Sequence, residues 1–257
     1  MSEESAGGGE RVAKVIARAG LCSRREAEAL IEQGRVIVNG EKLHRAAYNV
    51  KPGDEIVVDG KKLPASERPR LFRFHKPREV LVATRDPQGR RTIYDGMPSH
   101  LPRLMPVGRL DYNSEGLLLL TNDGGIKRHL ELPASGLVRR YRVRVYGTPD
   151  PDRLDRLKNG ISIDGVQYGS IDARMDGKPE GKNAWLVFAL TEGKNREVRR
   201  VCEQLGLQVN RLIRTDYGQF GLERLPRGGI EEVGPGELRK TLGTLAGPAH
   251  KKGKPAA

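Results

Sequence analysis

The sequence predicts an α+β protein with a small helix–helix–hairpin unit followed by a larger domain that holds a mixed or antiparallel sheet. Two helical patterns open the chain within residues 11–34, and a hairpin signal follows them directly. Beyond residue 69, β-branched, aromatic or leucine-rich runs dominate, with a few helical stretches and no regular β–α–β alternation. A chain of 257 residues is long enough for one medium domain and one small one.

The small unit is expected over residues 10–68. Its first helix has alanine, valine and isoleucine on one face and stops at Gly20. Its second helix begins at Ser23, which has capping-box spacing to Glu26. The run RVIVNGEKL then predicts a strand, an Asn-Gly turn and a returning strand, and EIVVDG predicts a further strand.

The larger domain is expected over residues 69–242, after the linker-like segment LPASERPR. Its expected strands are the runs LFRFH, TIYD, GLLLL, RRYRVRVYG, AWLVFAL and RLIRTDYG, and its expected helices are residues 125–132, 150–158 and 195–205. The acidic N-terminus (1–9) and the basic tail (243–257) are short of core-forming side chains, so both are expected to be disordered.

The charge of the chain predicts a polyanionic partner. The net charge is +13, and the excess is shared by the two folded parts, because residues 11–68 carry 12 basic and 8 acidic side chains and residues 69–242 carry 31 and 22. Nucleic acid is the commonest partner of such a surface. A basic enzyme without a polyanionic partner is the alternative.

Several functional classes lack their usual signals. The sequence has no apolar run long enough to span a membrane, and its acidic N-terminus does not have the pattern of a signal peptide. Two distant cysteines predict reduced, structural thiols of a cytosolic protein. Neither cysteines nor histidines have metal-ligand spacing, and no nucleotide-binding glycine motif occurs, so we expect neither a metal nor a cofactor.

Basic residues gather on the two helices of the small unit. Two of them lie in the first turn of the second helix, where the helix dipole disfavours cations. Such residues often form only a solvated face, but their closeness in sequence favours a surface that binds phosphates. The expected RNA-binding residues of this unit are Arg11, Lys14, Arg24, Arg25 and Arg35.

The stretch GRLDYNSEGLLLLTNDG places a carboxylate directly before the most apolar run of the chain. Asp111 in this position is either a turn residue or a group held rigidly for catalysis. Polar residues, including Arg109 and Glu115, crowd the entrance of the leucine run, which must be buried. This context favours a catalytic role for Asp111.

A second polar cluster is TEGKNREVRR. A helix that starts near Asn195 would leave Arg196, Arg199 and Arg200 on or beside its outer face. The three arginines are then solvated, bind phosphates, or include a partner for Asp111. In RRYRVRVYG, strand alternation places Tyr141 on the same face as two valines, opposite three arginines. Tyr141 is therefore a core aromatic, unless that face opens onto a cleft.

These motifs together resemble the RsuA/RluB family of bacterial ribosomal RNA pseudouridine synthases. The resemblance covers roughly residues 10–242 and includes the GLLLLTNDG and EGKNREVRR elements. The sequences TEGKNREVRR and LPRGG are most similar to the RluB branch, which acts on 23S rRNA of the large subunit. The small unit is similar to the RNA-binding module of ribosomal small-subunit protein four.

The resemblance implies a role for each matching residue. Asp111 corresponds to the catalytic aspartate, Tyr141 to the aromatic that contacts the target base, and Arg199 to the basic residue that pairs with the aspartate and orients it. Leu212 would form part of the apolar floor of the uracil pocket, and Arg109 would support catalysis. In addition, Arg196 and Arg200 are expected to bind RNA. The family commonly has a glycine shortly after Lys-Pro, where this chain has HKPREV with Glu79.

The implied reaction breaks the glycosidic bond of a uridine, turns the uracil and rejoins it through a ring carbon, which requires no cofactor. The expected partner is 23S rRNA or a large-subunit assembly intermediate, bound by a cytoplasmic monomer. Alternatives are a related synthase acting on 16S rRNA or tRNA, a non-catalytic ribosome-assembly factor, and a sugar glycosidase with Glu115 as its second carboxylate.

Overall fold

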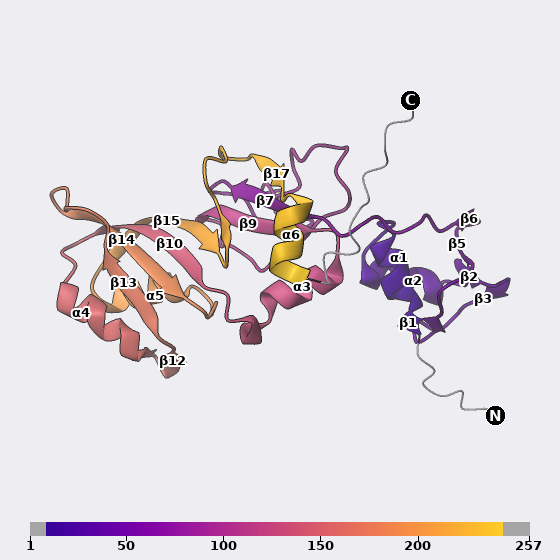
Figure 1. Cartoon of the computed structure of the whole chain (residues 1–257), viewed down its shortest axis with the longest axis horizontal. Helices are drawn as coiled ribbons and strands as arrows, with labels where there is room; N and C mark the ends of the chain where they lie inside the picture. Colours follow the sequence, from indigo (N-terminus) through magenta and orange to yellow (C-terminus); the bar gives the residue numbers. More distant parts are fainter. Residues whose placement is uncertain (1–8, 244–257) are drawn as a thin grey trace. The chain divides into compact units, whose positions relative to one another are not determined.

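A computed structural model describes residues 9–243, so the expectations for residues 1–8 and 244–257 lie outside the described part of the chain. Pro69 ends one compact unit and Arg70 begins the other. Figure 1 shows the helices and strands of each unit. Among residues 9–243, no helix is long and apolar enough to cross a membrane.

Two helices of the first unit begin and end close to where the sequence predicts. They are α1 (Val12–Arg18) and α2 (Arg24–Glu32). The capping box of α2 is confirmed, since the Ser23 hydroxyl accepts from the Glu26 N–H at 3.1 Å and the Ser23 N–H donates to the Glu26 carboxylate at 2.7 Å. This reciprocal pair satisfies two N–H groups that the helix itself cannot.

The strands of this unit form one sheet of four and a separate pair. The predicted Asn-Gly turn is confirmed, because Asn39 and Gly40 have φ of 51° and 85°, and Asp59 and Gly60 make a second turn of the same kind. The sheet order is β3-β2-β5-β6, and β1 pairs with β4. The strands are β1 (Glu10–Arg11), β2 (Val36–Val38), β3 (Glu41–Lys42), β4 (Asn49–Val50), β5 (Ile56–Val58) and β6 (Lys61–Lys62).

The second unit is built on a nine-stranded mixed sheet, in agreement with the predicted α+β class. The strand order is β13-β14-β10-β15-β9-β7-β17, with β16 beside β15 and β8 beside β9. Its strands are β7 (Leu71–Lys76), β8 (Met105–Val107), β9 (Glu115–Thr121), β10 (Arg139–Tyr146), β13 (Ile171–Met175), β14 (Asn183–Leu190), β15 (Gln208–Tyr217), β16 (Phe220–Gly221) and β17 (Ile230–Glu232), and β11 (Ile161–Ile163) and β12 (Val166–Tyr168) form a separate hairpin.

Helices cover parts of this sheet. The α6 helix packs on β7 and β9 through Leu238 and Leu242, and Figure 1 shows it against these strands. The helices are α3 (Gly124–Glu131), α4 (Pro151–Arg156), α5 (Glu197–Gln204) and α6 (Pro235–Leu242), with short 3₁₀ turns at Pro133–Ser135 and Leu157–Asn159. The three predicted helical stretches thus correspond to α3, α4 and α5.

The predicted strand at TIYD is wrong. Thr92 forms only an isolated bridge, and a turn follows it. The turn is local, because the Asp95 carboxylate accepts from the Thr92 N–H at 2.7 Å and the Asp95 N–H donates to the Thr92 carbonyl at 3.2 Å. Ile93 is buried without belonging to a strand, so apolar side chains here signal burial and not sheet.

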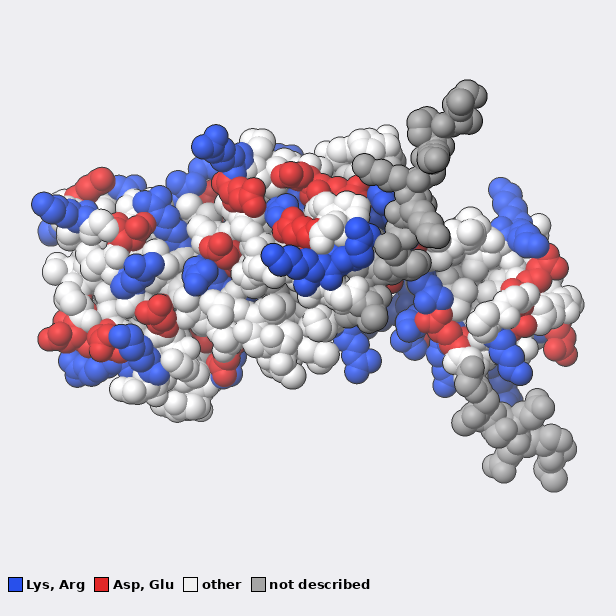
Figure 2. All heavy atoms as spheres, in the orientation of Figure 1, with Lys and Arg blue, Asp and Glu red and all other residues white. Residues whose placement is uncertain are grey.

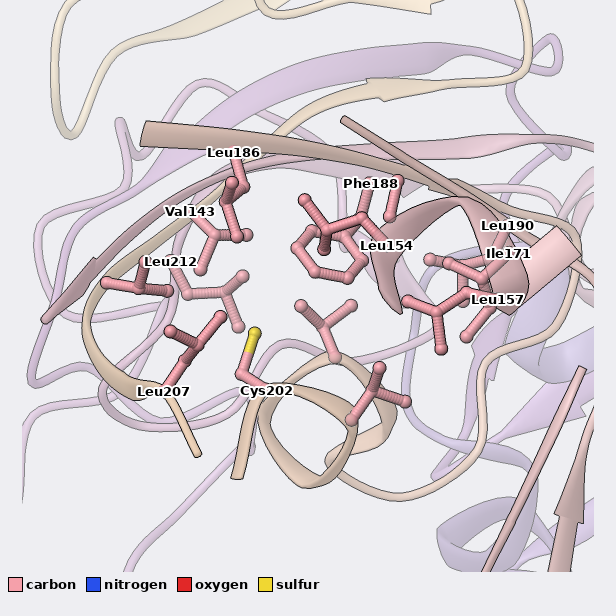
Figure 3. Packing of buried hydrophobic residues seen from close by; sticks show 14 of the residues in the cluster. Val143, Leu154, Leu157, Ile171, Leu186, Phe188, Leu190, Cys202, Leu207 and Leu212 are labelled. Carbon is pink, nitrogen blue, oxygen red and sulfur yellow. The ribbon is translucent and has the colours of Figure 1, made fainter. Parts of the chain in front are cut away.

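One large apolar cluster joins α4 and α5 to the faces of β10, β14 and β15. Figure 3 shows Cys202 pointing from α5 into this cluster, which also contains Val143, Phe188 and Leu212. Burial raises the pKa of the Cys202 thiol to about 12, so it remains protonated and inert at neutral pH. The expectation that Cys202 is a structural thiol agrees with this setting.

Among the strands of residues 9–243, one parallel junction joins the two halves of the sheet. It consists of β9 beside β15, with Ile213 opposite Glu115 and Arg214 opposite Gly116. Gly116 has φ of 107°, and a Cβ added there would lie 2.6 Å from the Arg214 nitrogen and closer still to its carbonyl oxygen. Only glycine therefore allows the two strands to approach each other at this point.

We expect Gly116→Ala to lower the free energy of unfolding by about 3 kcal/mol or more, because it combines backbone strain with overpacking. Urea denaturation at equilibrium would measure this loss. Gly124→Ala is the matched control, since a Cβ at Gly124 meets no atom within 4 Å. Equal stability of the two variants would contradict the close approach of β9 and β15.

Candidate functional site

A pocket of about 300 Å³ lies among the loop before β9, the strands β10 and β15, and the start of α5. It brings together five residues that the sequence nominates from distant segments. Asp111 reaches it from the loop, and its side chain is 38% exposed, so it is open to a ligand. The nominated residues that line the pocket are Arg109, Asp111, Tyr141, Arg196 and Leu212.

The floor and one wall of the pocket are apolar. Leu190, Val198 and Leu212 come from β14, α5 and β15, and all are buried. Tyr141 is half-buried beside them and packs against two core clusters. The predicted alternation of β10 is confirmed, because Val143 on the Tyr141 face is fully buried. A flat, uncharged ring such as a nucleobase suits this lining.

A buried lysine, Lys76, donates hydrogen bonds to the turn that carries Asp111. The Ser114 N–H donates to the Asp111 carbonyl at 3.0 Å and closes the turn. The Lys76 ammonium donates to the carbonyls of Pro77, Tyr112 and Ser114 at 3.0, 3.3 and 2.8 Å. Burial lowers the pKa of Lys76 to about 8, although the charges of Asp111 and Glu115 act in the opposite direction.

Glu79 gives the same turn a further contact. Its N–H donates to the Tyr112 carbonyl at 2.8 Å, and its φ of 60° lies in the left-handed region that favours glycine. The position where this chain departs from the resembled family is thus one where the backbone suits glycine. Glu79 keeps this conformation despite carrying a side chain.

Arg199 also holds this turn, but in a way that the sequence did not predict. It was expected on or beside the outer face of its helix, and this is wrong, because only 9% of it is exposed. Its guanidinium donates to the Asn113 carbonyl at 3.2 Å and lies 3.5 Å from the Ser114 hydroxyl. The turn before β9 covers the flank of α5 and supplies these acceptors.

The charges of Asp111 and Arg199 act on each other without a direct ion pair among the described residues. Burial and the charge of Arg196 lower the pKa of Arg199, while the charge of Asp111 raises it. The ion pair that Asp111 makes is with Arg196, at 3.9 Å between Nη1 and Oδ2. Arg196 also lies 3.9 Å from Glu203, so it bridges two carboxylates at the rim. Arg200 is half-buried and is not part of the lining.

Five further charged residues line the pocket and were missed. Arg214 is 2% exposed and donates through Nε to the Leu117 carbonyl at 2.7 Å. Arg139, also buried, donates to the Tyr217 hydroxyl at 2.9 Å. The sequence contains a signal for two of these residues, because strand alternation puts Arg139 on the same face as Tyr141 and Arg214 on the same face as Leu212. The missed residues are Glu131, Arg139, Lys194, Glu197 and Arg214.

Glu115 lies next to this site but is held in ion pairs. It is 1% exposed and accepts from Arg211 at 2.6 and 3.1 Å, with Arg227 at 3.3 Å. Burial raises the pKa of Glu115, and Arg211 and Arg227 more than reverse this, so its pKa lies below the ordinary value. Glu115 is not among the lining residues, which removes it as the second carboxylate of a glycosidase.

The five nominated basic residues of the first unit are all exposed. Three of them are paired locally: Lys14 with Glu10 at 2.8 Å, Arg24 with Glu28 at 3.2 Å, and Arg35 with Asp59 at 2.6 and 2.7 Å. Figure 2 shows basic and acidic side chains interspersed on this unit. Exposed pairs of this kind contribute little to stability and exchange readily for other anions.

Comparison with known proteins agrees with the geometry of the site. Residues 70–204 match the family described as RNA pseudouridylate synthase, and residues 10–56 match the S4 domain. The chain therefore belongs to the RNA pseudouridine synthase family. This confirms both the predicted family and the prediction that the chain is an enzyme acting on RNA.

Individual relatives extend the same similarity over most of the chain. An uncharacterized RNA pseudouridine synthase of Rickettsia bellii is 45% identical over 224 residues, which cover 87% of this chain and 96% of the relative. Ribosomal large subunit pseudouridine synthase B of Yersinia pestis is 41% identical over 233 residues, 88% of this chain and 73% of the relative. A crystal structure of a pseudouridylate synthase has a TM-score of 0.63 and 25% identity, covering 91% of this chain and 100% of that one.

We expect Lys76→Met to destabilise the fold by about 3 kcal/mol, because buried carbonyls of the Asp111 turn lose their donor. The pH dependence gives a second readout. The folded-state pKa of Lys76, about 8, lies below the ordinary lysine pKa of 10.5, so the unfolded chain binds more protons between these values. The stability of the wild type relative to Lys76→Met should therefore rise with pH across this window.

Urea denaturation at both ends of the window measures this effect. The exposed Lys178→Met is the control and should show no comparable pH-dependent difference. A wild-type stability that falls relative to Lys76→Met as the pH rises would show that Lys76 does not titrate as a buried base.

Proposed function

We propose that this enzyme converts a specific uridine of large-subunit (23S) ribosomal RNA to pseudouridine, with Asp111 as the catalytic residue and without a cofactor. The proposed substrate is supported by the relatives named ribosomal large subunit pseudouridine synthase B, which are 39–41% identical. The reaction is an isomerisation that gains no atoms and moves no electrons to an acceptor. We further propose that the enzyme acts as a monomer in the cytoplasm, on free rRNA or an assembly intermediate.

The observation that carries this proposal is the meeting of Asp111, Tyr141 and Leu212 in one pocket. The target uridine must leave its stack, at a cost of a few kcal/mol. Stacking on Tyr141 returns about 1–3 kcal/mol, so it offsets the cost only in part. Contacts between phosphates and basic side chains of both units supply the remainder.

We propose that the ribose of the bound uridine lies beside Asp111 while its base is seated on the apolar floor. In the route that we propose, its carboxylate removes a proton from the ribose beside the glycosidic carbon, and the uracil leaves as an anion. The uracil then turns and adds through its ring carbon as the proton returns to the ribose. The hydrogen of that ring carbon is then lost to water as a proton, and the nitrogen released from the ribose takes up a proton. Arg196 at 3.9 Å contacts the carboxylate directly, and buried Arg199 positions it through the turn.

The first unit would bind the same RNA through its exposed basic residues. Its match to the S4 domain and its similarity to a ribosomal protein module support this role. Because Arg24 and Arg35 already hold exposed carboxylates, phosphates would replace these partners at little cost. Arg11 and Arg25, also exposed, are the further candidates for phosphate contacts.

Asp111→Asn should keep the fold and RNA binding but reduce turnover at least about a thousandfold, roughly 4 kcal/mol. The test is a strain that lacks the gene, complemented with the wild type or with this variant, followed by mapping of pseudouridines in 23S rRNA, 16S rRNA and tRNA. We expect one 23S site to be lost and restored only by the wild type. Release of tritium from labelled uracil measures turnover in vitro.

Asp164→Asn is the control, since Asp164 lies in a turn with φ of 49°, a conformation that asparagine accepts. If the deletion strain lacked a pseudouridine in 16S rRNA or tRNA and not in 23S rRNA, that RNA would be the substrate instead. If the deletion strain had the same pseudouridines as the parent strain, the proposed activity would be wrong and a non-catalytic role in ribosome assembly would replace it.

Arg199→Ala should lower kcat about a hundredfold, roughly 3 kcal/mol, because the turn that positions Asp111 loses two contacts. RNA affinity and its salt dependence should hardly change, because Arg199 is too buried to reach a phosphate. Arg199→Lys should restore part of kcat, since an ammonium can still donate to the turn. Arg200→Ala is the control. If Arg199→Ala lowered only the affinity for RNA and left kcat unchanged, Arg199 would be a phosphate contact instead.

A further inference from the structure

The sheet face opposite the pocket carries a row of arginines and aromatic rings. Along β10, Arg142, Arg144 and Tyr146 alternate with the residues that face the apolar cluster. Trp185 of β14 and Arg211 of β15 lie directly opposite Arg144 on its two sides. These five residues form the arginine–aromatic face, and none of them lines the pocket.

Two aromatic rings of this face differ in what covers them. The guanidinium of Arg142 lies over the Trp185 ring at 4.2 Å, and that of Arg211 lies at 6.0 Å, so two arginines lie near the tryptophan ring. Tyr146 is 43% exposed, which is unusual among the large side chains of the described residues. Because Tyr146 and Trp185 are diagonal neighbours on adjacent strands, an exposed ring stands beside a ring that two arginines approach.

Two like charges on this face lie opposite each other on adjacent strands, which destabilises the fold. Arg144 and Arg211 are direct cross-strand partners, and like charges in such positions are destabilising. Arg142 is paired with Asp176 at 2.6 Å, and Arg211 with Glu115. Arg144 has no ion pair or side-chain hydrogen bond with any residue in the described part of the chain. A cation held beside another cation and left without a partner is suited to an anionic ligand.

We propose that the arginine–aromatic face binds a single-stranded stretch of RNA, with a base stacked on Tyr146 and phosphates held by Arg144 and its neighbours. The inference rests on the proposed function in taking RNA as the partner, but it concerns a surface separate from the catalytic pocket. Alternate residues of a strand are about 7 Å apart, which is close to the spacing of phosphates along an RNA strand.

A single strand suits this surface better than a duplex. Exposed rings on an open sheet stack on unpaired bases, whereas the bases of a duplex are stacked on one another and out of reach. Bound in this way, a segment of RNA outside the target loop would add affinity without entering the pocket. The face would therefore help a large RNA to bind more than it would help the chemical step.

Trp185 is the only tryptophan of the chain, so its fluorescence reports on this face alone. The probe is a single-stranded RNA of adenosine and cytidine only, which cannot be a substrate for uridine isomerisation. Titrated into the full-length protein, it should change Trp185 emission. Tyr146→Ala should weaken binding in this titration about tenfold, and Arg144→Gln should reduce the slope of log K against log salt by about 0.7.

Arg156→Gln is the matched control, because Arg156 is an exposed arginine of α4, which packs on the other face of the same sheet. Tryptophan emission that stays constant while RNA binds by anisotropy would overturn the proposal. Equal binding of a duplex, or variants that match the control, would also overturn it. Since the probe contains no uridine, these results stand whether or not the enzyme modifies 23S rRNA.

Discussion

Two buried cations under the Asp111 turn are the constraint on which the rest of the site depends. Lys76 donates to three backbone carbonyls and Arg199 to one, and both side chains are almost completely removed from water. Burying two positive charges is expensive unless acceptors surround them. The turn supplies the carbonyls of Tyr112, Asn113 and Ser114 as acceptors, so a shift of the turn would cost both cations hydrogen bonds. This holds in place the backbone that carries the Asp111 carboxylate.

The sheet completes this arrangement by bringing the two cations to one place. Lys76 ends β7 in one half of the sheet, whereas Arg199 belongs to α5, which packs on the other half. The parallel contact of β9 and β15 at Gly116 joins the halves. Glycine at this junction therefore matters for the proposed catalytic site, because the distance between the halves sets how both cations meet the turn.

The sequence was informative where a local pattern determines the structure. The capping box at Ser23, the Asn-Gly turn at Asn39 and the alternation around Tyr141 depend on neighbouring residues, and all were predictable. The burial of Arg199 was not, because the turn that covers it lies more than eighty residues earlier in the chain. Lys76 was missed for the same reason, since nothing beside it in the sequence shows that its ammonium is buried.

The charge around Asp111 is arranged so that this carboxylate remains accessible. Glu115, only four residues away, is neutralised by Arg211 and Arg227 and withdrawn from solvent. Asp111 meets Arg196 only at 3.9 Å and stays 38% exposed. The Glu115 carboxylate thus stabilises the sheet, whereas the Asp111 carboxylate is left partly unsatisfied. Because a tight ion pair would compete with a substrate for the carboxylate, a loose and distant partner suits the catalytic role that we propose for Asp111.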